Sequence, residues 1–166
     1  IISVAEEYGC DNSIIKAVHE TNKKQRKIFT DKILNFYSGN IKGKKFAFWG
    51  LAFKPNTNDM REAPSITVIN TLLKHGAVIN AYDPKATETA KTVFKDKINY
   101  AESSYNALED ADALILMTEW NEFRFPDTDK MLKLMNAPVI FDARNLYSAS
   151  RLKKAGFSYI NSGNAE

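Results

Sequence analysis

The sequence predicts an α/β fold in which a long helix precedes a doubly wound parallel sheet. Short apolar runs that resemble strands alternate with amphipathic stretches of about ten residues. A polar helical stretch precedes the first apolar run. The composition, 44% hydrophobic and 26% charged among 166 residues, is that of a globular domain. Because strands spaced in this way are joined by right-handed crossovers, we expect helices on both faces of the sheet.

The first segment, residues 1–40, reads as helix. Asp11, Asn12 and Ser13 are candidate caps for its long helix. Apolar residues gather toward the two ends, whereas residues 19–27 are polar on every face. A helix with a polar middle is expected either to bridge two packed bodies through solvent or to be a merely exposed helix.

Strands and helices alternate through the body, residues 41–166. The first strand covers Lys44 to Gly50, and an amphipathic helix from Ser65 to Lys74 is closed by Gly76. Further strands are predicted over residues 77–82, 98–100, 113–117, 138–142 and 157–160. Further helices are predicted over residues 87–95, 105–111, 127–135 and 149–155.

Several classes of function are disfavoured by composition. With one cysteine, Cys10, and two histidines, the chain cannot form an internal disulfide and lacks the ligands of a Cys/His zinc site. Cys10 has no base or cation cluster beside it, so we expect it to be inert. No apolar stretch approaches the ~20 residues of a membrane helix, and a signal-peptide pattern is absent, so a cytoplasmic protein without a membrane partner is expected.

The net charge of +3 is unevenly distributed. Residues 1–45 hold nine Lys or Arg against five Asp or Glu, whereas the remainder holds fourteen against fifteen. The basic residues between Lys23 and Lys27 have no aromatic stacking partners among them. Nucleic acid is therefore not an expected partner.

A long loop, Gly50 to Pro64, follows the first strand, where doubly wound sheets bind ligands. It has about fourteen residues where two to six suffice, and one glycine instead of the Gly-x-Gly-x-x-Gly that cradles a pyrophosphate. Its cations, Lys54 and Arg61, suit a phosphate-bearing ligand. Arg144 follows the strand over residues 138–142, so we expect three cations to face one crevice.

Each cation also has a plain structural interpretation. Lys54 can be solvated, and Arg61 can pair with Asp59 or Glu62 to pin the loop. Arg144 can pair with its neighbour Asp142 or cap a helix.

Residues at other strand ends could also contact a ligand, but a structural role is favoured for most of them. Asp83 ends the second strand, where a dinucleotide-binding acid would hold a ribose, but without the glycine pattern an ordinary Asp-Pro turn is favoured. Trp120 and Phe123 follow the fourth strand and are predicted to pack rather than to contact a ligand. Glu119 is predicted to cap a helix or to orient a cation.

The loop GLAFKPNTNDMREAPS, Gly50 to Ser65, strongly resembles the signature of the C-terminal domain of the UDP-glucose/GDP-mannose dehydrogenase family. The similarity continues through the segments 82–84, 118–120, 141–145 and 156–157. Residues 18–25 (VHETNKKQ) resemble the end of the family's central helical segment, which joins two α/β domains and builds the dimer. The resemblance covers essentially the whole chain and implies a Rossmann-like body.

Enzymes of this family oxidise the C6 hydroxymethyl group of a nucleotide sugar to a carboxylate, using two NAD molecules and a nucleophilic cysteine. The resemblance implies that residues 41–166 bind the UDP-sugar through Phe53, Lys54 and Arg144, and that Arg61 reaches the NAD. The sequence from Arg61 to Pro64 resembles that of the UDP-glucose branch, whose members make UDP-glucuronate, more than those of the GDP-mannose or N-acetylmannosamine branches.

The chain departs from the family pattern at its start. The glycine-rich segment that carries the family's cysteine has no counterpart, Cys10 does not match it, and the N-terminal dinucleotide fingerprint is absent. The resemblance therefore implies a fragment without a catalytic residue, inactive alone, whose partners are the missing NAD-binding domain and a second copy bound through the central helix. The alternative is a stand-alone, non-catalytic nucleotide-binding or assembly module.

Overall fold

A computed structural model describes residues 2–163, with side chains from residue 4 onward. Residue 1 and residues 164–166, the outer ends of the predicted segments 1–40 and 41–166, lie outside the described residues. Two helices come first, α1 (Ile2–Glu7) and α2 (Ser13–Phe36). The strands are β1 (Lys45–Trp49), β2 (Val78–Tyr82), β3 (Asn99–Tyr100), β4 (Ala113–Leu116), β5 (Val139–Asp142) and β6 (Ser158–Asn161). The remaining helices are α3 (Pro64–Lys74), α4 (Thr87–Phe94), α5 (Ser104–Ala107), α6 (Thr128–Leu134) and α7 (Ala149–Lys154), with 3₁₀ turns η1 (Lys95–Lys97) and η2 (Asn121–Phe123).

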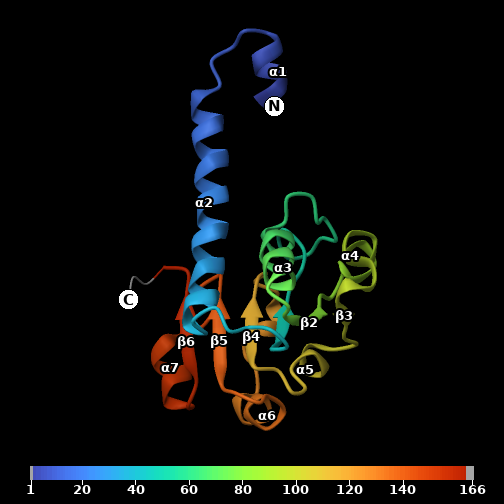
Figure 1. Cartoon of the computed structure of the whole chain (residues 1–166), viewed down its shortest axis with the longest axis vertical. Coiled ribbons are helices and arrows are strands. Elements are labelled where there is room, and N and C mark those ends of the chain that lie inside the picture. The colour runs from blue at the N-terminus through green and yellow to red at the C-terminus, as the bar shows by residue number, and fades with distance from the viewer. Residues whose placement is uncertain (1, 164–166) are drawn as a thin grey trace.

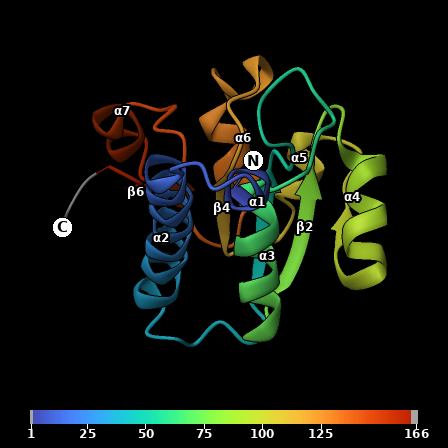
Figure 2. The same cartoon turned by 90° about the horizontal axis from the view of Figure 1, so that it is seen from above.

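The strands form one parallel sheet in the order β3-β2-β1-β4-β5-β6. In register, Ala47 of β1 lies opposite Asn80 of β2 and Leu114 of β4. The strand order reverses between β1 and β4, which is the arrangement of a doubly wound sheet. Figure 2 shows α2, α3 and α4 on one side of the sheet and α6 and α7 on the other. The predicted α/β class and its long leading helix are confirmed.

Two apolar cores lie against the two faces of the sheet. One joins Phe46 and Phe48 of β1 to residues of α2, α3 and α4, and the other joins Trp49 to residues of α5, α6 and α7. All residues of β4 and β5 are buried, as a strand covered on both faces requires.

The predicted elements are all present, with boundaries that differ by one to a few residues. The largest difference is the helix predicted over 105–111, which ends at Ala107. Ser103 caps it by accepting a hydrogen bond from the Asn106 N–H (3.1 Å). The chain then turns at Asp110, which has a φ of 56° and donates its N–H to the Leu134 carbonyl (2.8 Å). This contact with the end of α6 ends the helix early.

Helix α2 is anchored at one end only. Its N-cap residue is Asn12, which makes no side-chain cap bond, and Asp11, one residue earlier, accepts a hydrogen bond from the Ser13 N–H (2.9 Å). The first half rises beyond the body (Figure 1), and its residues from 13 to 25 are exposed, as predicted for the polar middle. In the second half, Phe29 and Ile33 are buried in the same core as β1.

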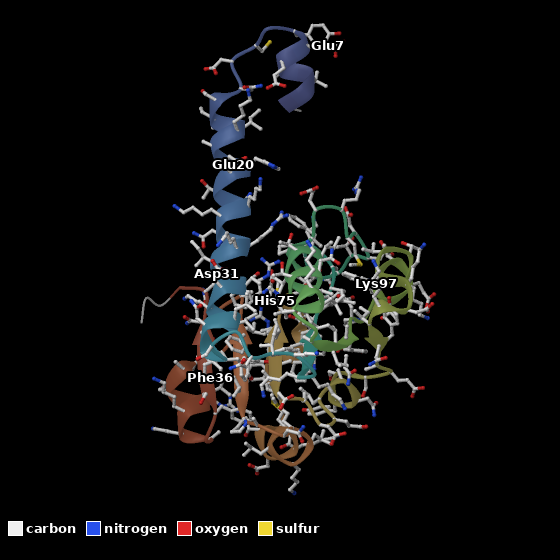
Figure 3. The ribbon with its side chains drawn as sticks, in the orientation of Figure 1. Glu7, Glu20, Asp31, Phe36, His75 and Lys97 are labelled. Carbon is white, nitrogen blue, oxygen red and sulfur yellow. The ribbon has the colours of Figure 1, made fainter. Side chains whose placement is uncertain are left out.

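The side chains of α2 show the same contrast between an exposed first half and a second half that packs on the body (Figure 3). Glu20 projects from the part of α2 that stands clear of the body, whereas Phe36 lies beside the sheet. The Phe36 ring contacts the Phe141 ring edge-on at 5.5 Å. Among residues 2–163, no helix combines the length and apolar content needed to cross a bilayer.

Candidate functional site

The loops after β1 and β4 touch each other where the strand order reverses. Gly50 takes a φ of +89°, and a Cβ there would lie 2.5 Å from the Cβ of Thr118. The Thr118 hydroxyl donates to the Ala52 carbonyl (2.6 Å). The glycine of this loop therefore permits close packing of two loops at the point where the strand order reverses.

Asp83 fixes this packing from the end of β2. Its Oδ2 accepts hydrogen bonds from the N–H groups of Leu51 (2.7 Å) and Ala52 (3.0 Å) and from Trp120 Nε1 (3.3 Å). Its Oδ1 accepts from the N–H groups of Lys85 (2.9 Å) and Ala86 (2.7 Å). The turn interpretation is confirmed, because the carboxylate is buried and engaged with the protein.

Trp120 and Phe123 pack, as predicted. Trp120 is buried, and the fully buried Phe123 stacks on Trp49 with ring centroids 5.0 Å apart. Neither ring closes over the site.

A pocket of about 340 Å³ lies beside these loops, at the carboxyl ends of β4 and β5. This volume is at the lower end of the range of small-molecule sites, roughly 300–1,000 Å³. The β1 loop, α3, the ends of β4 and β5 and helix α2 all contribute to its wall. The lining residues are Asn22, Gln25, Arg26, Phe29, Phe53, Pro64, Val68, Met117, Ala143, Arg144 and Ser162.

Arg144 is held rigidly in the wall of this pocket. Its Nε donates to the Met117 carbonyl (2.8 Å), and its Nη2 donates to the Phe53 carbonyl (2.8 Å). Glu119 Oε2 lies 3.0 Å from Nε. That buried oxygen accepts no hydrogen bond from the described residues, because the single Nε hydrogen points to Met117. Glu119 therefore orients a cation by charge, as predicted.

The prediction that Arg144 pairs with Asp142 is wrong for the side chain. The Asp142 carboxylate is fully buried and accepts backbone hydrogen bonds from Arg144 (2.8 Å), Leu146 (2.7 Å) and Tyr147 (3.2 Å). The Tyr159 hydroxyl donates to it as well (2.8 Å). Asp142 thus holds the backbone of the loop, and this leaves the Arg144 side chain to Glu119.

Phe53 and Lys54 sit on the exposed part of the β1 loop. Phe53 is 46% exposed, lines the pocket and donates its N–H to the Asp59 carbonyl (2.9 Å). Lys54 is exposed and is not among the residues that line this pocket. Its charge adds slightly to the lowering of the pKa of Asp59, for which the hydrogen bonds from Arg61 are the main cause.

Arg61 does not line this pocket and instead forms an ion pair with Asp59. Its Nε donates to Asp59 Oδ1 (3.0 Å) and its Nη2 to Asp59 Oδ2 (2.7 Å), and these bonds lower the pKa of Asp59 to about 2. It lines a second hollow, with Thr57, Asn58 and Thr89 among its neighbours. The expectation that three cations face one crevice is therefore wrong, and the pairing of Arg61 with Asp59 is confirmed. The loop folds back on itself between Phe53 and Asp59, which turns Arg61 away from Arg144.

No metal centre or activated cysteine is found in the part of the chain that the structure describes. Residues 2–163 contain no group of three or more His, Cys, Asp or Glu that could hold a metal ion. Cys10 is exposed in the turn between α1 and α2, where its Sγ lies 3.8 Å from the Tyr8 carbonyl oxygen.

Comparison with known proteins identifies the family. The sequence model of the UDP-glucose/GDP-mannose dehydrogenase family, UDP binding domain, matches residues 47–149. The chain belongs to this family. The match includes Phe53, Lys54, Arg61 and Arg144.

Individual members of the family match over nearly the whole chain. A UDP-glucose 6-dehydrogenase of Pseudomonas aeruginosa is 39% identical over 164 residues, which cover 96% of this chain and 36% of that protein. The UDP-glucose 6-dehydrogenase TuaD of Bacillus subtilis is 39% identical over 163 residues, or 98% of this chain and 35% of that protein. The chain thus spans about a third of the length of these relatives.

Solved structures show the same fold. A UDP-glucose dehydrogenase from the archaeon Pyrobaculum islandicum superposes with a TM-score of 0.77 at 28% identity, covering 99% of this chain and 35% of that one. A GDP-mannose dehydrogenase from Pseudomonas aeruginosa gives 0.68 at 17% identity, covering 97% of this chain and 36% of that one, and supports the fold alone.

One feature of the pocket in this UDP-binding domain was missed from sequence. Helix α2 contributes Asn22, Gln25, Arg26 and Phe29, which precede the segment matched by the family model. These positions follow the i, i+3, i+4, i+7 spacing of one helix face. Residues 19–27 are polar on every face, so the sequence carries no local sign that one of these faces continues into the buried Phe29.

Proposed function

We propose that the chain binds a UDP-sugar in the pocket beside β4 and β5, as part of an NAD-dependent UDP-glucose 6-dehydrogenase that makes UDP-glucuronate. The observation that carries the proposal is the pocket itself. It lies in the family's UDP-binding domain, and its wall includes Arg144 and Phe53, which are joined by a hydrogen bond from Arg144 Nη2 to the Phe53 carbonyl. The names of the most similar relatives support the choice of UDP-glucose.

The groups at the pocket suit a nucleoside diphosphate. A guanidinium has five N–H donors, of which Arg144 uses two for the carbonyls of Met117 and Phe53. The others are free to bind phosphate oxygens in the planar geometry that arginine favours. Phe53 offers an apolar face to a base or sugar ring, and the exposed Lys54 adds a positive charge next to it in the same loop.

The remaining parts of the reaction belong to other segments of the intact protein in this proposal. Arg61 contacts NAD at the junction with the NAD-binding domain, and a cysteine in a glycine-rich segment elsewhere in the intact protein supplies the nucleophile. The chain alone is then inactive. Residues 1–40 form the end of the central helical segment, and residues 41–166 form the UDP-sugar-binding domain of a cytoplasmic enzyme.

A homodimer through the central segment fits the exposed surface of α1 and α2. Tyr8 is 76%, Ile14 78% and Val18 54% exposed. Apolar side chains at this level of exposure favour a partner surface over solvent.

Calorimetric titration of the chain with UDP, UDP-glucose and GDP tests the binding proposal. We expect the uridine nucleotides to bind and Arg144→Ala to raise the Kd of UDP by roughly 10-fold or more, because it removes charged hydrogen bonds. Arg151→Ala, at an exposed arginine of α7, is the matched control and is expected to leave the Kd unchanged. Failure of UDP to bind, or an unaffected Arg144→Ala variant, would contradict the site.

In the intact enzyme, Lys54→Ala is expected to raise the KM for the sugar nucleotide by several-fold at unchanged kcat, because a uniform binding contact is lost. Preference for GDP-mannose would contradict the UDP-glucose assignment.

A further inference from the structure

Arg26 projects from α2 into the same pocket wall as Arg144. It lies in the basic stretch that stands largely in solvent, yet its side chain is only 20% exposed. Asn22, one turn before it, and Gln25, the residue directly before it, line the pocket as well. The pocket wall therefore includes arginine residues from two elements that are far apart in the sequence.

The two arginines are held very differently. Arg144 is fixed by two carbonyl hydrogen bonds of 2.8 Å and by the Glu119 carboxylate. Among the described residues, Arg26 has one ion-pair contact, from its Nη1 to Glu62 Oε2 at 3.5 Å. Since 3.5 Å is at the outer limit of a hydrogen bond and the Glu62 side chain is 77% exposed, this pair is weak.

The charges around the pocket indicate a role for Arg26. Glu119 already offsets the charge of Arg144, so a diphosphate that binds there needs a further cation. Arg26 can supply one. Its present partner, Glu62, can return to water at little cost because most of its side chain is already solvated.

We propose that Arg26 is a second phosphate-binding residue of the pocket, which exchanges Glu62 for the diphosphate of a bound nucleotide. The proposal rests on the proposed function, since it assumes that a nucleoside diphosphate occupies this pocket. It adds a ligand contact from α2, outside the segment matched by the UDP-binding family model. A bound nucleotide then bridges the leading helix and the loop after β5.

Titration of the full chain with UDP and with uridine tests the role of Arg26. We expect Arg26→Ala to raise the Kd of UDP by about 10-fold, the loss of one charged hydrogen-bonded contact, and to leave the Kd of uridine unchanged. Arg26→Lys is expected to lie in between, because it keeps the charge but loses the planar fork. Lys23→Ala is the matched control, because Lys23 is a neighbouring cation of α2 that lines a different hollow.

The Glu62→Gln variant tests whether Arg26 contacts the ligand or serves only to hold the loop through its ion pair with Glu62. If Glu62 competes with the phosphates for Arg26, Glu62→Gln lowers the Kd of UDP by about two- to five-fold. If the pair serves only to hold the loop, Glu62→Gln weakens binding or leaves it unchanged, and this result would overturn the proposal. The test does not depend on Arg26→Ala folding normally.

The outcomes for the two arginines are distinguishable. Weakened UDP binding in Arg144→Ala with unchanged binding in Arg26→Ala overturns the role of Arg26 and leaves the proposed site standing. An equal loss of uridine and UDP binding in Arg26→Ala also overturns it, because a phosphate contact cannot affect uridine. Absence of UDP binding to the unmodified chain overturns both proposals.

Discussion

Asp83 connects three segments that are distant in sequence through one buried carboxylate. It accepts hydrogen bonds from the loop after β1, from the turn before α4 and from Trp120. We expect Asp83→Ala to lower the free energy of unfolding by at least about 3 kcal/mol, because it leaves several buried N–H groups without an acceptor. Urea denaturation measures this change.

Asp129→Ala is the control for this prediction, because Asp129 is exposed in the first turn of α6 and should cost no more than about 1 kcal/mol. A similar small loss in Asp83→Ala would show that the buried bonds contribute little.

A comparison of Gly50 with Gly156 separates the cost of backbone strain from the cost of a steric clash. Both have a left-handed backbone, with φ of +89° and +91°. A Cβ at Gly50 would collide with Thr118, whereas at Gly156 it would meet nothing within 4 Å. Gly156→Ala is therefore expected to cost about 1 kcal/mol for the backbone alone.

Gly50→Ala is expected to cost at least about 2 kcal/mol more than Gly156→Ala, because the loops after β1 and β4 must separate. Thermal or urea unfolding compares the two variants. Equal losses of unfolding free energy in the two variants would mean that the loops after β1 and β4 can separate at little cost, and that the contact with Thr118 does not hold them together.

At the scale of single elements, α2 combines a buried end with an exposed end. Ile33 is fully buried in the core, whereas Ile14 is 78% exposed on the first half of the helix. Ile33→Ala is expected to lower the free energy of unfolding by about 2–5 kcal/mol through the cavity it leaves. The same substitution at Ile14 should change it by less than about 0.5 kcal/mol in the monomer.

A loss of stability in Ile14→Ala that grows with protein concentration would instead show that this end of α2 is buried in a dimer. Circular dichroism during urea titration follows both variants, and sedimentation reports the oligomeric state. Equal effects of the two substitutions in the monomer would contradict the anchoring described for α2.

Most elements were predictable because their signals are local. Each strand is a short apolar run, and each helix has an apolar face at helical spacing. The exception, α5, ends early because Asp110 hydrogen-bonds to the carbonyl of Leu134, more than twenty residues away. A contact of that kind has no signature in the local sequence.

At the scale of the whole molecule, partly buried tyrosines are expected to make stability depend on pH. Burial, together with the charges of Asp112 or Asp142, raises the pKa of Tyr37, Tyr147 and Tyr159 above the ordinary value of 10.0. A raised pKa means that the folded state keeps its proton longer than the unfolded state. The stabilisation is complete below about pH 10 and is lost as the pH rises further.

We therefore expect the urea midpoint to fall steeply between about pH 10 and about pH 12. Tyr147→Phe should lower the midpoint at neutral pH, because it removes the hydrogen bond to the Phe123 carbonyl. It should also make the alkaline decline shallower, because one titrating group is gone. An unchanged alkaline slope would show that Tyr147 does not contribute to it.

The order of the elements, the parallel sheet, the cationic loop after β1 and the resemblance to one dehydrogenase family could all be predicted from the amino-acid sequence. These features follow from periodicity and from contiguous motifs, which neighbouring residues carry. The tertiary structure decided which cations share a pocket. Arg144 joins Arg26 of a helix more than a hundred positions earlier, whereas Arg61, only seven residues after Lys54, is held by Asp59 in another hollow. Such groupings depend on how the loops fold back and on which face of α2 meets the sheet, and only long-range packing fixes both.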